Sequence, residues 1–197
     1  MNETVRFATF GIVICLGAAA CSPATAGSRS PSATPTVAAT FSPSANQALT
    51  ATFKSPMMGY SVKYPAGWKV TPATARWPPG AINYWDSPEL DKLDGKSAEF
   101  RGSSQALATG QSTAQWVSAY LASAGANCGT QEHVSVGDQI GLIDGNDCAF
   151  DTSHGGYPGR LYDLVVVAGG RGYNFAMEGQ VDHAFFLAML ATITLTP

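Results

Sequence analysis

The sequence has few charges and no apolar run of membrane-spanning length. Charged residues make up 13% of the 197 residues, and 11 basic against 14 acidic side chains give a net charge of -3. Because the chain lacks a basic stripe, we expect no nucleic-acid partner. The apolar stretch from Phe7 to Ala20 is shorter than the roughly 20 residues of a transmembrane helix, so we do not expect it to span a membrane.

Patterns for metal ligands are missing as well. The three histidines are His133, His154 and His183. Their positions in the sequence are too far apart to match the short spacings between ligands that are typical of zinc sites. The segment from Asp144 begins like a calcium loop, but Cys148 stands where that loop needs an oxygen ligand. We therefore predict no metal and no cofactor, and we expect a hairpin turn from Asp144 to Asn146.

A catalytic signature is also lacking. Asp151-Thr-Ser153-His154 contains an acid, a nucleophile and a base, but the Gly-x-Ser-x-Gly elbow of many hydrolases is absent. Residues so close in one segment rarely face one another as a catalytic triad must. We predict that the protein is not an enzyme, with an undetected secreted hydrolase as the alternative.

Residues 1–20 have the features of an export signal. Their apolar run suits the hydrophobic part of a signal peptide. Ala18-Ala-Ala-Cys21 resembles the lipobox of bacterial lipoproteins, although Ala18 stands where leucine is usual. We predict that Cys21 carries a lipid that anchors the protein to the cell membrane on its extracytoplasmic side. The alternative is cleavage after Ala24-Thr-Ala26, which would give a freely secreted protein.

The remaining cysteines agree with export. Cys15 leaves with the signal and Cys21 is lipidated or removed, so either cleavage leaves Cys128 and Cys148. An even pair in an oxidising compartment predicts a disulfide.

A change in composition divides the exported chain. Residues 21–50 are almost entirely Ser, Thr, Pro, Ala and Gly, which cannot bury enough apolar surface to fold. We predict that they form a flexible tether, and that residues 51–197 form a single domain.

The start of that domain carries a resemblance. Tyr60, Val62 and Tyr64 alternate with polar residues, which predicts a half-buried strand, and Pro65-Ala-Gly67 predicts a turn into the next strand. The run Gly59-Tyr-Ser-Val-Lys-Tyr-Pro-Ala-Gly-Trp68 resembles the opening of the PsbP-like family. That family includes extrinsic photosystem subunits and uncharacterised bacterial lipoproteins. The resemblance covers Phe53 to Val70 and implies an antiparallel sheet packed against two helices, in an α/β/α sandwich.

Later patterns fit an α+β class. Ser112-Thr-Ala-Gln115 is a capping box that predicts a helix ending near Gly125. Strands are predicted over 132–136, 160–168 and 173–178, with Leu164–Val167 as the central, most buried strand. A second helix follows Asp182, with an apolar face of Phe185, Phe186, Met189 and Leu190.

One loop is a candidate binding site. Prolines keep the segment from Arg76 to Asp86 irregular, and its aromatic side chains could stack on a ligand. The candidate ligand-binding residues are Arg76, Trp77, Tyr84, Trp85 and Asp86. The alternative is that the aromatics cap one end of the sheet.

We therefore expect a membrane-tethered binding or accessory module of the cell envelope. Its partner is either a small molecule or an envelope protein. By analogy with the PsbP-like family, an extrinsic subunit of a membrane complex is a further alternative.

Overall fold

The computed structural model describes residues 47–81, 88–126, 128–150 and 159–197. These residues form two helices and antiparallel strands, which confirms the predicted α+β class. The helices are α1 (Thr113–Ala124) and α2 (His183–Leu190). The strands are β1 (Ala51–Lys54), β2 (Tyr60–Tyr64), β3 (Lys69–Thr71), β4 (Asp91–Asp94), β5 (Ala98–Ala106), β6 (Glu132–Val136), β7 (Gln139–Phe150), β8 (Gly159–Ala168), β9 (Arg171–Gly179) and β10 (Thr194–Leu195). Neither helix in this part of the chain has the length and apolar character needed to cross a membrane.

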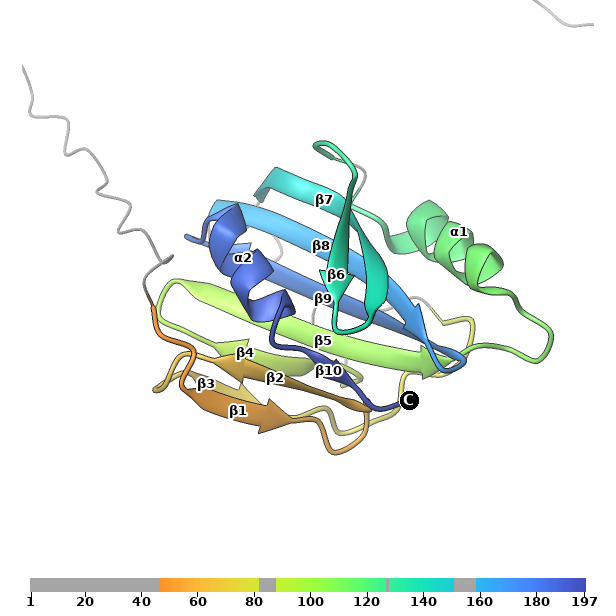
Figure 1. Ribbon diagram of the computed structural model, residues 1–197, viewed down its shortest axis with the longest axis horizontal. Helices are drawn as coiled ribbons and strands as arrows, with labels where there is room; N and C mark the ends of the chain where they lie inside the picture. Colours follow the sequence, from red (N-terminus) through yellow and green to blue (C-terminus); the bar gives the residue numbers. More distant parts are fainter. Residues whose placement is uncertain (1–46, 82–87, 127, 151–158) are drawn as a thin grey trace, which may run out of the picture. The chain divides into compact units, whose positions relative to one another are not determined.

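The strands form two antiparallel sheets (Figure 1). The larger has the order β3-β4-β5-β9-β8-β7-β6, and the smaller has the order β1-β2-β10. The middle strand of the larger sheet is β9, whereas the sequence pattern placed Leu164–Val167 of β8 there. That prediction was wrong by one strand, because the valine run makes β8 the more apolar strand, whereas the equally buried β9 carries the polar residues Asn174 and Glu178.

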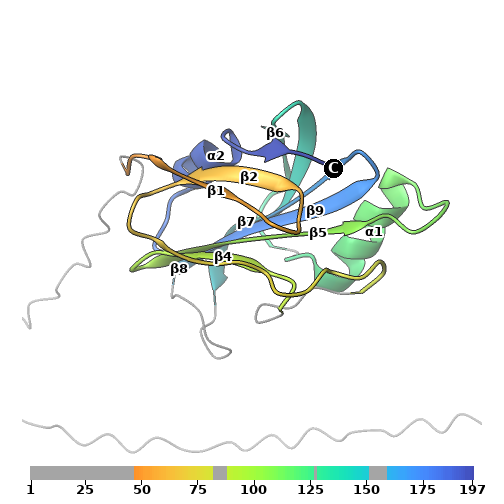
Figure 2. The ribbon, with the colours of Figure 1, turned by 90° about the horizontal axis from the view of Figure 1, so that it is seen from below.

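The two faces of the large sheet pack into separate clusters. Phe100 of β5, Leu164 of β8 and Phe175 of β9 belong to a cluster with α2 and the small sheet. Val165, the next residue of β8, points the other way and packs with Trp116 and Tyr120 of α1. Figure 2 shows α2, β1 and β2 together on one side of the large sheet.

The residues behind the PsbP-like resemblance lie largely in the first of these clusters. β2 spans the predicted Tyr60–Tyr64, and Tyr60 and Val62 are buried as the alternation predicts. The ring of Tyr60 meets that of Phe175 edge-on, with 5.0 Å between centroids. Trp68 packs against Phe185 of α2 at 6.2 Å. These aromatic residues of the motif hold the small sheet and α2 onto the large sheet.

Both helices start where their caps predict. The Ser112 hydroxyl accepts the backbone N–H of Gln115, and the Gln115 side chain accepts the N–H of Ser112, which completes the capping box. In α2 the Asp182 carboxylate accepts the N–H of Phe185 at 2.7 Å.

The hairpin turn predicted from Asp144 to Asn146 does not exist. β7 runs through this segment, and the preceding turn lies between Val136 and Gln139. Gly145 has another role: a Cβ there would lie 2.5 Å from the Cβ of Ala126. The glycine allows the segment after α1 to approach β7 closely, and the strand has register irregularities around it.

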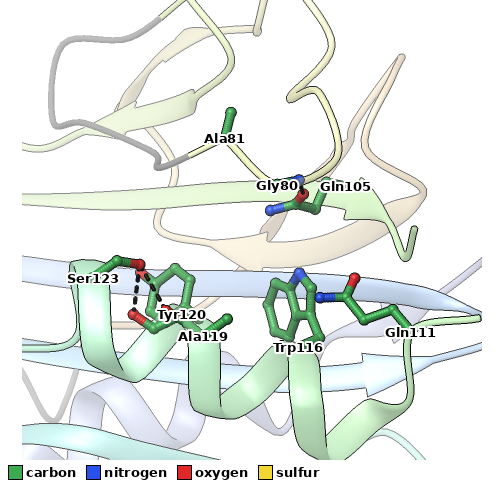
Figure 3. Close-up of a pocket in the computed structure, with 8 residues that line it drawn as sticks. All are labelled: Gly80, Ala81, Gln105, Gln111, Trp116, Ala119, Tyr120 and Ser123. Carbon is green, nitrogen blue, oxygen red and sulfur yellow. Dashed lines mark hydrogen bonds between the residues drawn. The ribbon is translucent and has the colours of Figure 1, made fainter.

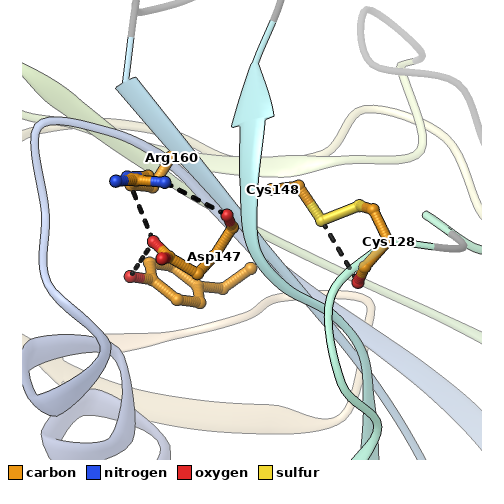
Figure 4. Close-up of polar contacts among 5 residues, drawn as sticks. Cys128, Asp147, Cys148 and Arg160 are labelled. Atoms are coloured by element: carbon orange, nitrogen blue, oxygen red, sulfur yellow. Dashed lines mark hydrogen bonds and ion pairs between the residues drawn. A yellow bond between two sulfur atoms is a disulfide. The ribbon is translucent and has the colours of Figure 1, made fainter.

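The predicted disulfide is present. Cys128, four residues after α1 ends, is bonded to Cys148 of β7, with 5.7 Å between their Cα atoms (Figure 4). Cys128 also accepts the backbone N–H of Asn146 through its carbonyl oxygen at 3.2 Å. Beside it, Asp147 has a left-handed backbone (φ 61°) and pairs with Arg160 at 3.1 Å. The covalent bond therefore joins the end of α1 to the irregular part of β7.

Replacing both cysteines, Cys128→Ser and Cys148→Ser, should lower the free energy of unfolding by about 3 kcal/mol, because the bond closes a loop with a sequence separation of 20. Denaturant unfolding of the variant and of wild type with and without reductant measures this. The reduced wild type is the matched control and should unfold like the variant. Two alkylated thiols in denatured, non-reduced protein would contradict the bond.

Candidate functional site

The candidate site is a cavity of about 50 Å³ between α1, the end of β5 and the turn at Gly80 (Figure 3). The described residues that line it are Gly80, Ala81, Gln105, Gln111, Trp116, Ala119, Tyr120 and Ser123. A cavity needs a volume of roughly 10–15 Å³ to hold one water molecule. The space therefore admits a group of a few atoms rather than a whole drug-sized ligand.

One face of α1 forms the helical wall. Trp116, Ala119, Tyr120 and Ser123 are spaced by three, four and seven residues from Trp116, so they share a helix face. Trp116 and Tyr120 are 3% and 8% exposed. The capping box sets where the helix begins and thereby which residues form this face.

A tight turn forms the opposite wall. The Ala81 N–H donates to the Pro78 carbonyl at 3.1 Å, and Gly80 has a φ of 78°. Proline at the second position and a glycine with positive φ at the third are typical of a type II turn. The turn directs the Gly80 N–H at the side-chain oxygen of Gln105, 2.7 Å away.

This hydrogen bond sets the orientation of the Gln105 amide. Because Oε1 accepts from Gly80, Nε2 is turned elsewhere, and Gln105 is only 3% exposed. Gln111 is held in the same way, since its Oε1 accepts the Ala108 N–H at 3.0 Å. Figure 3 shows the amide nitrogen of Gln111 directed toward the Trp116 indole.

Three side chains thus bring N–H donors to the cavity. They are Gln105 Nε2, Gln111 Nε2 and Trp116 Nε1. Among the residues that the structure describes, none of these nitrogens donates to a protein acceptor. The site therefore offers donors to whatever enters it.

Contacts among three aromatic rings hold α1 and the turn at Gly80 together. Trp116 and Tyr120 stack with 5.6 Å between centroids, and Trp77 meets both edge-on at 6.2 and 6.1 Å. Trp77 is 3% exposed, and its indole N–H donates to the Ala81 carbonyl at 2.9 Å. Trp77 thus anchors the turn at Gly80, which agrees with the alternative interpretation of the loop aromatics as packing residues.

The closeness of α1 to the sheet depends on a glycine in β9. A Cβ at Gly172 would overlap the six-membered ring of Trp116, with atoms Cδ2, Cε2 and Cζ2 nearest. Gly172 therefore provides the space in which the indole lies on the sheet.

Buried carboxyl groups lie behind Tyr120. Asp163 accepts a hydrogen bond from the Asn174 amide at 2.5 Å, and Asp144 accepts one from Gln131 at 2.7 Å. The pKa of Asp163 is raised to about 7, mainly by burial; the hydrogen bond from Asn174 opposes this rise, and the charge of Asp144 adds to it. The pKa of Tyr120 is well above its ordinary value because of burial, with added effects from Asp163 and Asp144. The rear of the site is therefore acidic, and its phenol stays protonated.

A second charged cluster occupies the same sheet face. Arg101 of β5 pairs with Glu178 of β9 at 2.8 Å and contacts Glu99, and all three side chains are buried. The pKa of Glu99 is raised to about 7, mainly by burial and also by a hydrogen bond with Asp94, while the Arg101 charge lowers it. None of these side chains lines the cavity.

The predicted site residues fall into two groups. Arg76 is exposed and donates to the Met57 carbonyl at 3.4 Å, and Trp77 lies in the aromatic cluster. Tyr84, Trp85, Asp86 and Cys21 lie outside the described residues, as do Ser153 and His154. The binding role of the loop stays a prediction.

In the described part of the chain, no group of three or more His, Cys, Asp or Glu side chains is placed to hold a metal ion.

A larger hollow of about 330 Å³ lies elsewhere. Its lining is Gln47, Ala66, Gly67, Trp68, Gly95, Lys96, Ser97 and Ala98. Its polar side chains, including Lys96 and Ser97, are exposed. The smaller cavity is the better candidate because Gln105 and Trp116 are buried and the Gln105 and Gln111 amides are oriented before any ligand arrives.

Sequence reasoning missed most of the cavity. It predicted the helix that carries Trp116 and Tyr120, but it did not identify Gln105, Gln111 or Ser123 as lining residues. The only signal was Pro78-Pro-Gly80, which predicts a turn without saying what the turn contacts.

Comparison with known proteins gives weak likenesses. A crystal structure from Bacteroides thetaiotaomicron VPI-5482 has a TM-score of 0.47 and 13% identity, over 76% of this chain and 50% of the other, so this chain spans half its length. Cyanobacterial PsbP (CyanoP) from Synechocystis sp. PCC 6803 has a TM-score of 0.45 and 11% identity, over 74% of this chain and 91% of the other. No protein-family model matches the chain. A search of curated proteins found no match. The likenesses concern the fold alone.

Gly172→Ala should destabilise the protein by about 1–3 kcal/mol, since the added methyl group meets the Trp116 ring and the sheet backbone cannot move away freely. Urea unfolding measures the loss. The matched control is the same change in a Trp116→Ala background, where the cost of adding the methyl group should largely disappear. An equal cost in both backgrounds would contradict the proposed contact.

The stability of the protein should fall as the pH rises from about 4 through about 7. The pKa of Asp163 is about 7 in the folded state against an ordinary 3.8, so the folded protein holds a proton that the unfolded chain has lost. A pKa change of this size corresponds to about 4 kcal/mol. Glu99 acts in the same direction.

Asp163→Asn tests this effect, because the asparagine keeps an oxygen to accept from Asn174. Compared with wild type, the variant should gain stability at pH 8 relative to pH 4, as measured by denaturant unfolding. Asp138→Asn, in the exposed turn before β7, is the control and should follow wild type. A pH profile of Asp163→Asn parallel to that of wild type would contradict the assignment.

Proposed function

We propose that the protein is an extracytoplasmic lipoprotein whose folded part binds a ligand without catalysing a reaction. The main observation that supports this is the cavity beside α1, which is lined by oriented N–H donors and by aromatic side chains. Such a combination of an apolar surface with a few placed polar groups is typical of ligand sites.

The lining favours binding over catalysis. Among the lining residues that the structure describes, the hydroxyl groups belong to Ser123 and Tyr120. Ser123 donates to the Ala119 carbonyl at 2.7 Å, and Tyr120 has a raised pKa. A serine nucleophile needs a base within hydrogen-bond reach, and none of the lining residues in the described part of the chain can accept a proton near neutral pH.

Two features support the extracytoplasmic location. The lipobox-like Ala18-Ala-Ala-Cys21 follows an apolar run, and the chain forms a disulfide between Cys128 and Cys148. Disulfides persist in oxidising compartments outside the cytoplasm. A lipid on Cys21 would hold the folded part at the membrane through the Ser/Thr/Pro/Ala-rich tether.

We also propose that the fold is a form of the PsbP-like α/β/α sandwich. The proposal is supported by the Gly59–Trp68 pattern, whose Tyr60 and Trp68 pack onto β9 and α2. It is also supported by the assignment of α1 and α2 to different clusters. A role as an extrinsic subunit of a membrane complex would follow only by analogy.

Expression of the full chain in a bacterium tests the anchoring. Wild type should partition into the detergent phase and carry a lipid on an N-terminal Cys21 by mass spectrometry, whereas Cys21→Ser should be unlipidated. Cys15→Ser is the matched control and should behave like wild type, since that residue leaves with the signal. An unmodified wild-type chain that begins at Gly27 would contradict the lipid anchor. Hydrolysis of an ester, peptide or glycan by the pure protein, abolished by Ser153→Ala, would contradict the non-catalytic role.

A further inference from the structure

We propose that the cavity beside α1 binds an acetamido group, so that the ligand is an N-acetylated compound. The inference rests on the proposed function as a binding module and specifies the chemistry of that same site. It follows from the donors, the charges, the acceptor at Ser123 and the size of the cavity.

The donors require an oxygen acceptor. Gln105 Nε2, Gln111 Nε2 and Trp116 Nε1 all belong to cavity-lining side chains, and each amide has its oxygen engaged by a backbone N–H. A ligand without an acceptor would leave the buried Gln105 nitrogen without a hydrogen bond, which disfavours its binding. A carbonyl oxygen can accept two of these donors at once.

The charges exclude a carboxylate as the preferred acceptor. None of the described residues that line the cavity is a lysine or an arginine. Behind Tyr120, Asp144 and Asp163 act on the phenol electrostatically. A bound anion would have no compensating cation among the described lining residues, so a neutral carbonyl is favoured.

The remaining lining suits the rest of an acetamido group. Ser123 uses its proton toward the Ala119 carbonyl, which leaves its oxygen lone pairs to accept an N–H from the ligand. Ala81, Ala119 and the Tyr120 ring offer apolar surface to a methyl group. An acetamido group has four non-hydrogen atoms, and a cavity of about 50 Å³ has room for a group of that size.

Two sources could supply this group at the cell envelope. One is an N-acetylated amino sugar of a glycan, and the other is an N-acetylated amine or peptide. Both present the same carbonyl, N–H and methyl, so the cavity recognises their shared part.

The test is NMR titration of the folded, disulfide-bonded protein with the Trp116 indole N–H as reporter, assigned with Trp116→Phe. Probes carrying the group are N-acetylglucosamine and N-acetylglycine methylamide. Matched probes without it are glucose, glucosamine and acetate. Both acetamido probes should shift the Trp116 signal saturably, and the matched probes should not. A larger effect from one acetamido probe would identify the source of the ligand.

Two variants test the assigned contacts. Gln105→Glu keeps an oxygen to accept from Gly80 but removes the donor, and it should weaken acetamido binding about fivefold or more. Ser123→Ala removes the acceptor and should weaken binding about fivefold, whereas Ser118→Ala, an exposed position on α1 outside the cavity, should not change it. Unchanged binding in Gln105→Glu with an unchanged fold would overturn the proposal.

Failure of this ligand class is distinguishable from failure of the proposed function. If acetate or glucose shifts the Trp116 signal as strongly as its acetamido counterpart, the cavity binds ligands but the acetamido assignment is overturned. If no probe and no fraction of a cell-envelope extract shifts that signal, both the acetamido assignment and the binding role of this cavity are overturned.

Discussion

The contact between Trp116 and the bare backbone at Gly172 is the constraint on which this face of the molecule depends. α1 can lie close to β9 only because no side chain stands beneath the indole ring. With the ring in place, Tyr120 stacks on it and Trp77 meets both, so the turn at Gly80 is held over the end of β5. The cavity is the space that this arrangement leaves between the helix and the turn.

The large sheet uses its two faces in different ways. One face, with Phe100 and Phe175, is an apolar core against α2 and the small sheet. The other carries buried polar side chains: Arg101 forms an ion pair with Glu178, and Asn174 donates a hydrogen bond to Asp163. Buried charges are costly, and the raised pKa values of Glu99 and Asp163 express that cost. The stability of the fold is therefore linked to pH.

Local patterns predicted the elements better than their contacts. The alternation in Tyr60–Tyr64, the capping box at Ser112 and the cap at Asp182 each concern neighbours in the chain, and each is confirmed. The turn from Asp144 was wrong because Asp-Gly usually marks a hairpin, whereas Gly145 is needed for a close approach to Ala126. A glycine looks the same in sequence whether it serves a turn or a packing contact.

The sequence alone determined the α+β class, the helix starts and the pairing of Cys128 with Cys148. These follow from short-range hydrogen bonding and from the exclusion of the other cysteines. Only the tertiary structure decided the cavity. Its walls come from the turn at Gly80, the end of β5 and one face of α1, and the Gln105 amide is oriented by a backbone group 25 residues away. A side chain held by a distant partner leaves no periodic trace in the sequence, because its position depends on how the sheet and helix pack.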